Sequence, residues 1–219
     1  MGSLWDGYRL GDAIRGNNMP SRGFFSLANQ LCLEYPGSIV CDYTRRTHRY
    51  NDCAALANIV RMRHKLYHSS KSFSCDGSPP TNTTVVHLRL GDSLINDDCF
   101  INPCIGEIHR KKTRVNYVKT KDYYSDIRNM NIAIVTNPGR IMEAKHSPMY
   151  KNVLQRSEKY LSDFVNAMEG QGNRVVIRRN CRPDEDFVYA VMAAHFVPAG
   201  GGFSKIINCT RTALGSNMS

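Results

Sequence analysis

The sequence predicts an α/β protein whose C-terminal part is a Rossmann-like parallel sheet with flanking helices. Three short apolar runs carry this prediction, at residues 85–88, 132–136 and 175–177. A short apolar run bounded by turn residues is typical of a strand buried inside a parallel sheet. Segments with helical patterning separate the runs, and an alternation of strand and helix indicates parallel strands joined by crossover helices.

The helices between the runs are predicted from apolar spacing. Residues 150–168 repeat apolar side chains at helical intervals, and the glycines at 170 and 172 mark the end of this helix. Shorter helices are expected at 123–130 and 187–195. The second of these is preceded by a break at Arg182-Pro183 and by three acidic residues, which favour a helix N-terminus because they oppose the positive end of the helix dipole.

A polar segment rich in serine, with two prolines and a glycine, divides the chain at residues 70–83. We interpret it as a linker between a short N-terminal α/β region, residues 1–69, and a nucleotide-binding domain, residues 84–219. The first region has a possible strand at 38–41 and a helix with a basic outer face at 54–66. It is short for a complete α/β domain.

The most informative segment directly follows the first predicted strand. It reads His87-Leu88-Arg89-Leu90-Gly91-Asp92. Arg89 would stand where open α/β sheets bind ligands, and its forked, permanently charged guanidinium suits a phosphate. Gly91 permits a sharp turn, and Asp92 can act as a base. The alternative is an ordinary strand end with a salt-bridged arginine.

A second segment of interest follows a brief strand expected at Phe196-Val197, which Pro198 would end. Three glycines, 200–202, precede Phe203, Ser204 and Lys205. A glycine-rich bend that opens a helix exposes backbone N–H groups able to hold a diphosphate, and Ser204 and Lys205 would add a hydroxyl and a cation. A flexible turn is the alternative.

The two segments, in this order and at this distance, resemble the fucosyltransferases that share a His-x-Arg-x-Gly-Asp-type motif, such as the protein O-fucosyltransferases and the α1,2- and α1,6-fucosyltransferases. The resemblance covers residues 84–212 and implies the nucleotide-sugar half of a GT-B fold, with a reduced first domain. It implies GDP-fucose as donor, a glycan or glycoprotein as acceptor, and no metal or other cofactor. Many members carry a second arginine after the first, where this chain has Leu90.

The resemblance also assigns roles to individual residues. Arg89 would contact the donor diphosphate. Asp186, Phe203 and Ser204 would contact the guanosine and the phosphates. The remaining expected donor-site residues are His87, Gly202 and Lys205, although His87 is at least as well explained as a hydrogen-bonded structural histidine.

Transfer from a nucleoside diphosphate requires stabilisation of a departing anion and, when it inverts the sugar, a base for the acceptor hydroxyl. Asp92 is the nearest candidate base, with Asp97 and Asp98 behind it. The triplet Asp184-Glu185-Asp186 superficially matches a metal-binding pattern. We interpret it as a helix start in which Asp186 contributes to donor binding.

The net charge of +10 suits an anionic partner, either a nucleotide diphosphate or a nucleic acid. The basic residues are dispersed in short clusters without a nucleic-acid-binding signature, so nucleic acid is not the expected partner. No apolar stretch is long enough for a membrane span. The expected location is therefore cytoplasmic or in the Golgi lumen.

The eight cysteines lack zinc-site spacing. Two alternatives stay open for them: disulfides, with Cys99 and Cys104 closing a small loop, or buried free thiols. Glycosylation sequons begin at Asn82, Asn208 and Asn217. Their number is close to the chance expectation, so these sequons alone do not indicate the cellular compartment.

Overall fold

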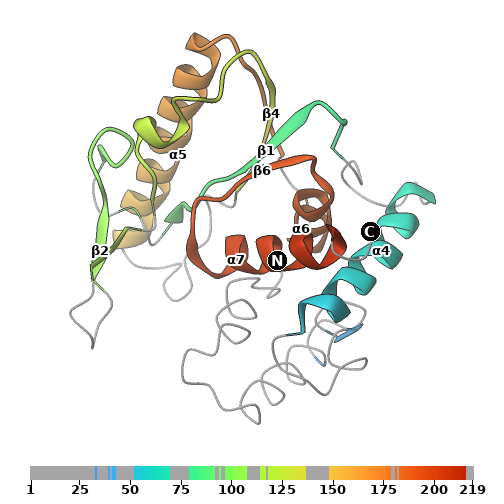
Figure 1. Ribbon diagram of the computed structural model, residues 1–219. Coiled ribbons are helices and arrows are strands. Elements are labelled where there is room, and N and C mark those ends of the chain that lie inside the picture. Colours follow the sequence, from blue (N-terminus) through green and yellow to red (C-terminus); the bar gives the residue numbers. More distant parts are fainter. Residues whose placement is uncertain are drawn as a thin grey trace. The chain divides into compact units, whose positions relative to one another are not determined.

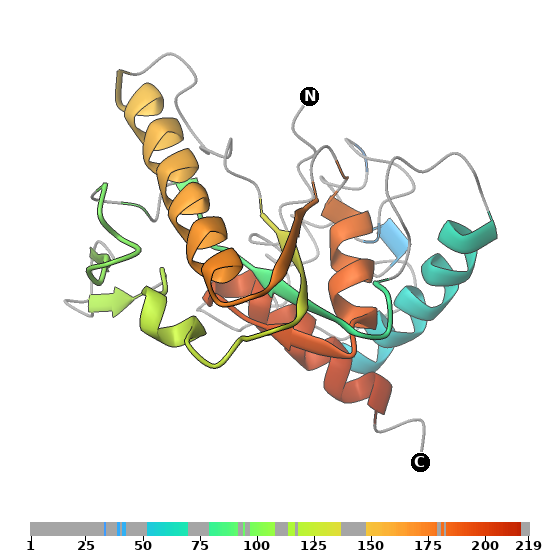
Figure 2. The ribbon, with the colours of Figure 1, turned by 90° about the horizontal axis from the view of Figure 1, so that it is seen from above.

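The chain forms two compact units in the computed structural model (Figures 1 and 2). Unit 1 combines Met1–Thr81, Arg179–Ala193 and Gly201–Ser219, and unit 2 combines Asn82–Arg178 with Ala194–Gly200. The structure describes residues 33, 39, 41–42, 52–69, 79–91, 94, 97–107, 114–116, 118–136, 148–178, 181 and 183–215. The domain limits expected from the sequence stay a prediction.

Unit 2 is built on a four-stranded sheet in the order β5-β4-β1-β6, and every neighbouring pair is parallel. The strands are β1 (Thr83–His87), β4 (Asn131–Val135), β5 (Arg174–Ile177) and β6 (His195–Val197). Counted along the chain, this order is third, second, first and fourth strand, which is the arrangement of a Rossmann-like half. The predicted α/β fold class is therefore confirmed.

The apolar runs mark the strands to within two residues. All five residues of β1 and four of the five in β4 are buried, as strands in the middle of a parallel sheet require. β5 lies at the edge, and its residues alternate between exposed and partly buried. The brief strand expected around Phe196 is β6, which includes His195 as its first residue.

Helix α5 (Pro148–Gly170) confirms the long helix predicted from apolar spacing. It lies against β5 (Figures 1 and 2) and buries one stripe of side chains. The stripe includes Val153, Leu161, Phe164 and Met168. Phe164 meets Phe100 and Tyr124 edge to face, with ring centroids 6.1 and 4.9 Å apart. Such aromatic pairs add about 0.5–1.5 kcal/mol each beyond their buried area.

The segment between β1 and β4 differs from the prediction. It contains a two-stranded antiparallel sheet, β2 (Ile105–Glu107) with β3 (Arg114–Asn116), for which the sequence analysis predicted no strands. The helix expected at 123–130 is wrong, because only a 3-10 turn, η2 (Lys121–Tyr124), forms there. Tyr124 and Ile127 are buried without a longer helix, and Asn129, at φ 54°, redirects the chain just before β4 begins.

Unit 1 contains α4 (Cys53–Ser69), α6 (Pro183–Met192) and α7 (Gly201–Gly215), and α7 packs on both of the others. Asp52 caps α4 by accepting the Ala55 N–H at 2.9 Å. A disulfide joins Cys53 in α4 to Cys209 in α7, with the two Cα atoms 5.8 Å apart.

Two local predictions in unit 1 are wrong. The strand expected at 38–41 does not form, because residues 39, 41 and 42 are helical. The helix expected at 187–195 ends at Met192, and His195 belongs to β6. Pro183, expected as a break, is the first residue of α6, where its missing N–H costs no helical hydrogen bond.

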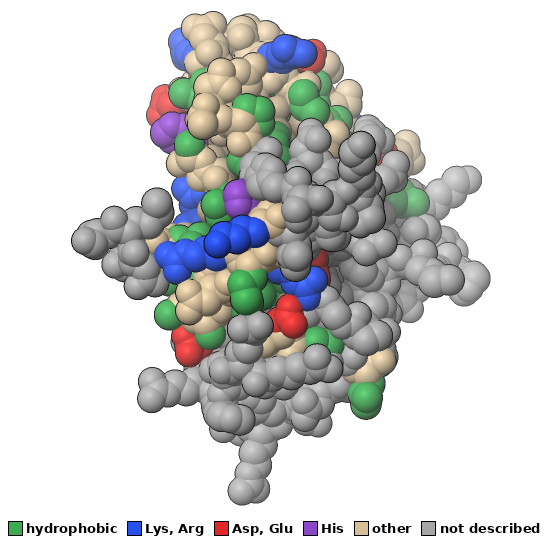
Figure 3. All heavy atoms as spheres, turned by 90° about the vertical axis from the view of Figure 1, so that its right-hand side faces the viewer, with side chains coloured by type: hydrophobic (Ala, Val, Ile, Leu, Met, Phe, Trp, Pro, Cys, Tyr) green, Lys and Arg blue, Asp and Glu red, His purple; other side chains and the backbone are tan. Residues whose placement is uncertain are grey.

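Charged side chains are interspersed on the described surface. On the face drawn in Figure 3, the Lys and Arg side chains form small separate groups, and acidic side chains lie beside some of them. Within the described residues, no helix is both long and apolar enough to cross a membrane.

Asn173 fastens the turn before β5 to the turn before β4. Its side chain is buried and donates to the carbonyls of Ile127 and Met168, at 2.8 and 2.9 Å, while its Oδ1 accepts the Met130 N–H at 2.9 Å. We expect Asn173→Ala to lower the free energy of unfolding by about 2 kcal/mol, since the Ile127 carbonyl and the Met130 N–H lose this partner, whereas the Met168 carbonyl still accepts the Gln171 and Asn173 N–H groups. Chemical denaturation measures this. The exposed Asn152→Ala on α5 is the matched control and should change stability by less than about 0.5 kcal/mol.

Candidate functional site at the carboxyl edge of the sheet

The carboxyl end of β1 is held tightly on the β4 side. His87, its last residue, lies opposite Val135 of β4. The contact continues one residue further, because the Leu88 N–H donates to the Val135 carbonyl at 3.1 Å and the Thr136 hydroxyl donates to the Leu88 carbonyl at 3.1 Å. Arg89 follows directly, and its side chain is partly buried.

On the other side of β1, the pairing with β6 stops earlier. The last paired residues are Val86 and Val197. Pro198 comes next and has no N–H to donate, so the hydrogen-bonded ladder cannot continue there. The Pro198 carbonyl instead accepts the hydroxyl of Tyr123 at 2.9 Å. Two residues after Pro198, Gly200 has a φ of 128°, a value that favours glycine.

This edge of the sheet has the topology at which α/β proteins bind ligands. The chain leaves β1 towards β4 on one side, whereas β6 lies on the other side. The carboxyl ends of β1 and β6 therefore form the switch point of the sheet, and ligands of open α/β sheets bind outside such a point. The first segment singled out from the sequence begins with His87, the last residue of β1. The glycine-rich second segment follows Val197, the last residue of β6.

The turn after Arg89 is fixed by α5. Gly91 has a φ of 79°, which confirms the sharp turn expected there, and its N–H donates to the Ser157 hydroxyl at 3.1 Å. Ser157 is fully buried. It lies on the apolar stripe of α5 between Val153 and Leu161. A small polar residue among apolar ones is the only feature of the sequence that could have indicated this contact.

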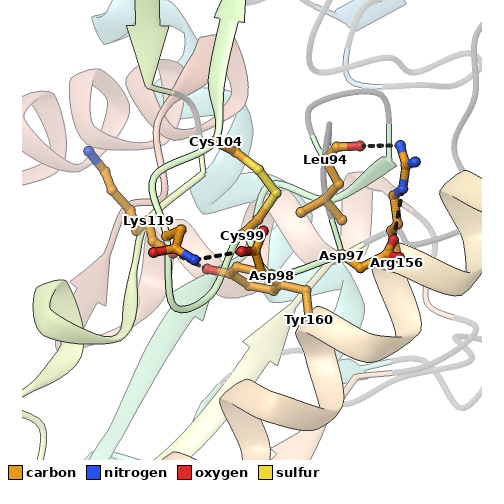
Figure 4. The surroundings of a disulfide bond; sticks show 9 residues. Leu94, Asp97, Asp98, Cys99, Cys104, Lys119, Arg156 and Tyr160 are labelled. Atoms are coloured by element: carbon orange, nitrogen blue, oxygen red, sulfur yellow. Dashed lines mark hydrogen bonds and ion pairs between the residues drawn. A yellow bond between two sulfur atoms is a disulfide. The ribbon is translucent and has the colours of Figure 1, made fainter.

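The rest of the loop is attached to the same helix (Figure 4). Arg156 binds the Asp97 carboxylate at 2.9 Å and the Leu94 carbonyl at 3.5 Å, and Tyr160 donates to the Lys119 carbonyl at 2.5 Å. A disulfide joins Cys99 to Cys104 and closes the loop. Of the two alternatives that the sequence left open, a disulfide or free thiols, the structure has the disulfide. Three neighbouring side chains of α5 thus hold the segment that follows the motif.

His87 is electrically neutral in this environment. Its side chain is buried, and burial together with the nearby positive charge of Arg89 lowers its pKa from 6.5 to about 3. A neutral imidazole does not help to neutralise a diphosphate. Within the motif, positive charge therefore comes from Arg89.

The candidate bases differ in what surrounds them. Asp92, the first choice, lies outside the described residues. Asp97 is exposed and paired with Arg156, and Asp98 accepts the side-chain amide of Asn102 at 2.5 Å. Both reserve candidates are thus already engaged by neighbouring side chains, and the assignment of Asp92 stays a prediction.

The acidic triplet forms the first turn of α6, which confirms its interpretation as a helix start. Asp186 and Glu185 are buried. Asp184 accepts the Ile39 N–H at 3.0 Å, and burial raises its pKa to about 6. Among the described residues, no three side chains of metal-binding type gather into a group that could hold an ion.

The glycine-rich segment opens a helix, as expected. α7 begins at Gly201, and its first turn has no acidic residue. Phe203 is partly buried with its ring 6.0 Å from that of Phe187, Ser204 is buried, and Lys205 is exposed. For Gly202 the structure describes the helical backbone but not its surroundings.

The expected site residues are thus distributed over both units. Unit 2 holds His87, the last residue of β1, and Arg89, which follows two residues later; unit 1 holds Asp186 and residues 202–205. Sequence reasoning missed Ser157 and Tyr123, the two side chains that fix the turns at this edge. Tyr123 carried no signal, because its partner is 75 residues away in the sequence.

Searches of protein-family models, of curated proteins and of solved structures found no match to this chain. The resemblance to fucosyltransferases therefore rests on the motif residues themselves.

The depressed pKa of His87 makes a prediction about acid. The folded protein should keep His87 neutral between its ordinary pKa of 6.5 and about 3, whereas the unfolded chain takes up a proton there. His87 thus contributes stability that is present above pH 6.5 and is lost as the pH falls towards 3. NMR titration of the imidazole nitrogens measures this directly. If the imidazole of His87 titrates near 6.5 in the native protein, the buried, neutral assignment is contradicted.

Proposed function

We propose that the protein is an inverting, metal-independent glycosyltransferase that uses a nucleoside-diphosphate sugar, with GDP-fucose as the donor and a glycan or glycoprotein as the acceptor. The observation that supports the proposal is that β1 and β6, the strands that precede Arg89 and the glycine-rich segment, are parallel neighbours at the switch point of the sheet. The identity of the sugar and of the base rests on the resemblance to fucosyltransferases.

The chemistry needs a positive environment for the leaving diphosphate. Cleavage of the bond between the sugar and the diphosphate leaves negative charge on the phosphate oxygens, and donors fixed in advance stabilise it most effectively. Arg89 supplies a planar pair of N–H donors from the end of β1. Residue 201, four positions after Val197 at the end of β6, begins a helix, and the positive end of a helix dipole also favours an anion.

The acceptor hydroxyl must lose its proton as it attacks the sugar from the opposite face. Asp92 would take this proton, because it follows the Gly91 turn that α5 holds in place. Asp186, Phe203 and Ser204 would contact the guanosine and phosphates, as the resemblance implies, with Gly202 allowing close approach and Lys205 adding charge. His87, being neutral, would act by shape and hydrogen bonding.

The first test concerns metal. Because a guanidinium and helix N–H groups take the place of a cation, transfer or slow donor hydrolysis should continue at an unchanged rate in excess EDTA. The assay is release of GDP from GDP-fucose. Activity that disappears in EDTA and returns with Mn²⁺ would show that a metal ion carries the leaving group.

The second test concerns Arg89. Replacing it with alanine should lower turnover by about 10²–10³, the loss typical of one charge-stabilising donor. Arg89→Lys should restore little, since an ammonium cannot form the planar fork. Turnover is measured as GDP release at saturating donor.

The matched control is Arg128→Ala. Arg128 is an exposed arginine of the same unit, and it lies before the amino end of β4, at the other edge of the sheet. This variant should keep full turnover. Near-normal activity of Arg89→Ala would overturn the proposal. Tight GDP binding by the parent protein without any transfer would instead indicate a non-catalytic relative, and a preference for oligonucleotides over every nucleotide would indicate a polyanion-binding protein.

A further inference from the structure

The cysteines of the described residues point to an oxidising environment. Each of the six, at positions 41, 53, 99, 104, 181 and 209, is in a disulfide. The Cα atoms of the two pairs Cys53–Cys209 and Cys99–Cys104 are 5.8 and 5.1 Å apart, within the range that a disulfide spans without backbone movement. Cytosolic proteins seldom keep such bonds, whereas proteins of the secretory pathway and the extracellular space do.

Asn82 is the first residue of a sequon, Asn82-Thr83-Thr84, and it is exposed in the turn that leads into β1. The following threonines are buried, because they already belong to the strand. Their burial is compatible with modification, since the sequon is read while the chain is still unfolded. The folded protein requires only that the asparagine side chain itself reach solvent.

The position of Asn82 also leaves the candidate site unobstructed. Asn82 precedes β1, whereas Arg89 follows it, so the two residues lie at opposite edges of the sheet. Five strand residues at about 3.3 Å each separate these edges by roughly 16 Å. A bulky group on Asn82 therefore does not need the space in which a donor would bind.

Asn208 begins a second sequon, Asn208-Cys209-Thr210, in the middle of α7. The helix buries Ile206, Ile207 and Thr210 and exposes Lys205, Asn208 and Thr212. The Thr210 hydroxyl bonds the Ile206 carbonyl, and Cys209 bonds Cys53, so both neighbours are committed to the fold. Asn208 itself faces solvent.

We propose that Asn82 and Asn208 are N-glycosylated and that the protein folds in the secretory pathway. In the modification, the side-chain amide nitrogen forms a bond to the anomeric carbon of an oligosaccharide carried on a lipid diphosphate. The bond between that carbon and the diphosphate breaks, and one amide proton leaves with the diphosphate. The inference rests on exposure, sequon and disulfides, and it is independent of the transferase activity.

The experiment uses the full chain isolated from the cells that make it. The protein is treated with peptide N-glycosidase F and then digested and analysed by mass spectrometry. Release of an N-glycan converts the asparagine into aspartate, so peptides containing residues 82 and 208 should appear in the aspartate form. Intact-protein electrophoresis should show a shift to lower mass after the same treatment.

Variants assign each glycan. Asn82→Gln and Asn208→Gln should each remove one step of the electrophoretic shift, and the double variant should remove both. Asn58→Gln is the matched control, because Asn58 is exposed on α4 but begins no sequon. GDP binding by Asn82→Gln should equal that of the parent. Unmodified asparagine at both positions, in protein whose disulfides are intact, would overturn the proposal.

Discussion

The arrangement of unit 2 depends on one requirement, that every backbone polar group of the buried strand β1 has a partner. β1 is buried along its whole length and meets the requirement by pairing with β4 on one side and β6 on the other. The pairing outlasts the strand on the β4 side and ends early on the β6 side, where Pro198 has no N–H. This asymmetry leaves the residues after β1 and β6 outside the ladder at one edge.

The excess of positive charge has a partly structural explanation. In unit 1, Arg211 donates to the carbonyls of Ala190, Val191 and Ala193 at the end of α6, and Arg61 donates to the Leu214 carbonyl at the end of α7. Cations at helix C-termini satisfy free carbonyls and oppose the negative end of the dipole. In unit 2, Arg156 holds the Asp97 loop. These three arginines, of the 29 Lys and Arg residues in the chain, thus have structural partners.

The sequence predicted what depends on local pattern and failed where long-range packing decides. Apolar runs located β1, β4 and β5 because buried parallel strands are continuously apolar, and apolar spacing located α5. The helix expected at 123–130 failed because Tyr124 and Ile127 reach the core from a single turn. For the candidate site, Arg89 and the glycine turn could be placed from sequence. The roles of Ser157 and Tyr123 could not, since both depend on partners far away in the chain.

Because His87 is neutral, other groups must stabilise the negative charge of the leaving diphosphate in the proposed chemistry. If its pKa were ordinary, it would share the diphosphate charge with Arg89 on acidification, but burial keeps it uncharged to about pH 3. One guanidinium cannot neutralise a diphosphate by itself, and Leu90 provides no second one. In the proposed site, the remaining stabilisation would come from Lys205 and from groups without a formal charge. Helix N-termini provide such groups, with an effect equivalent to about half a positive charge, and α7 begins one residue after the end of unit 2's last segment. The proposed activity therefore depends on the glycine-rich start of α7 as well as on Arg89.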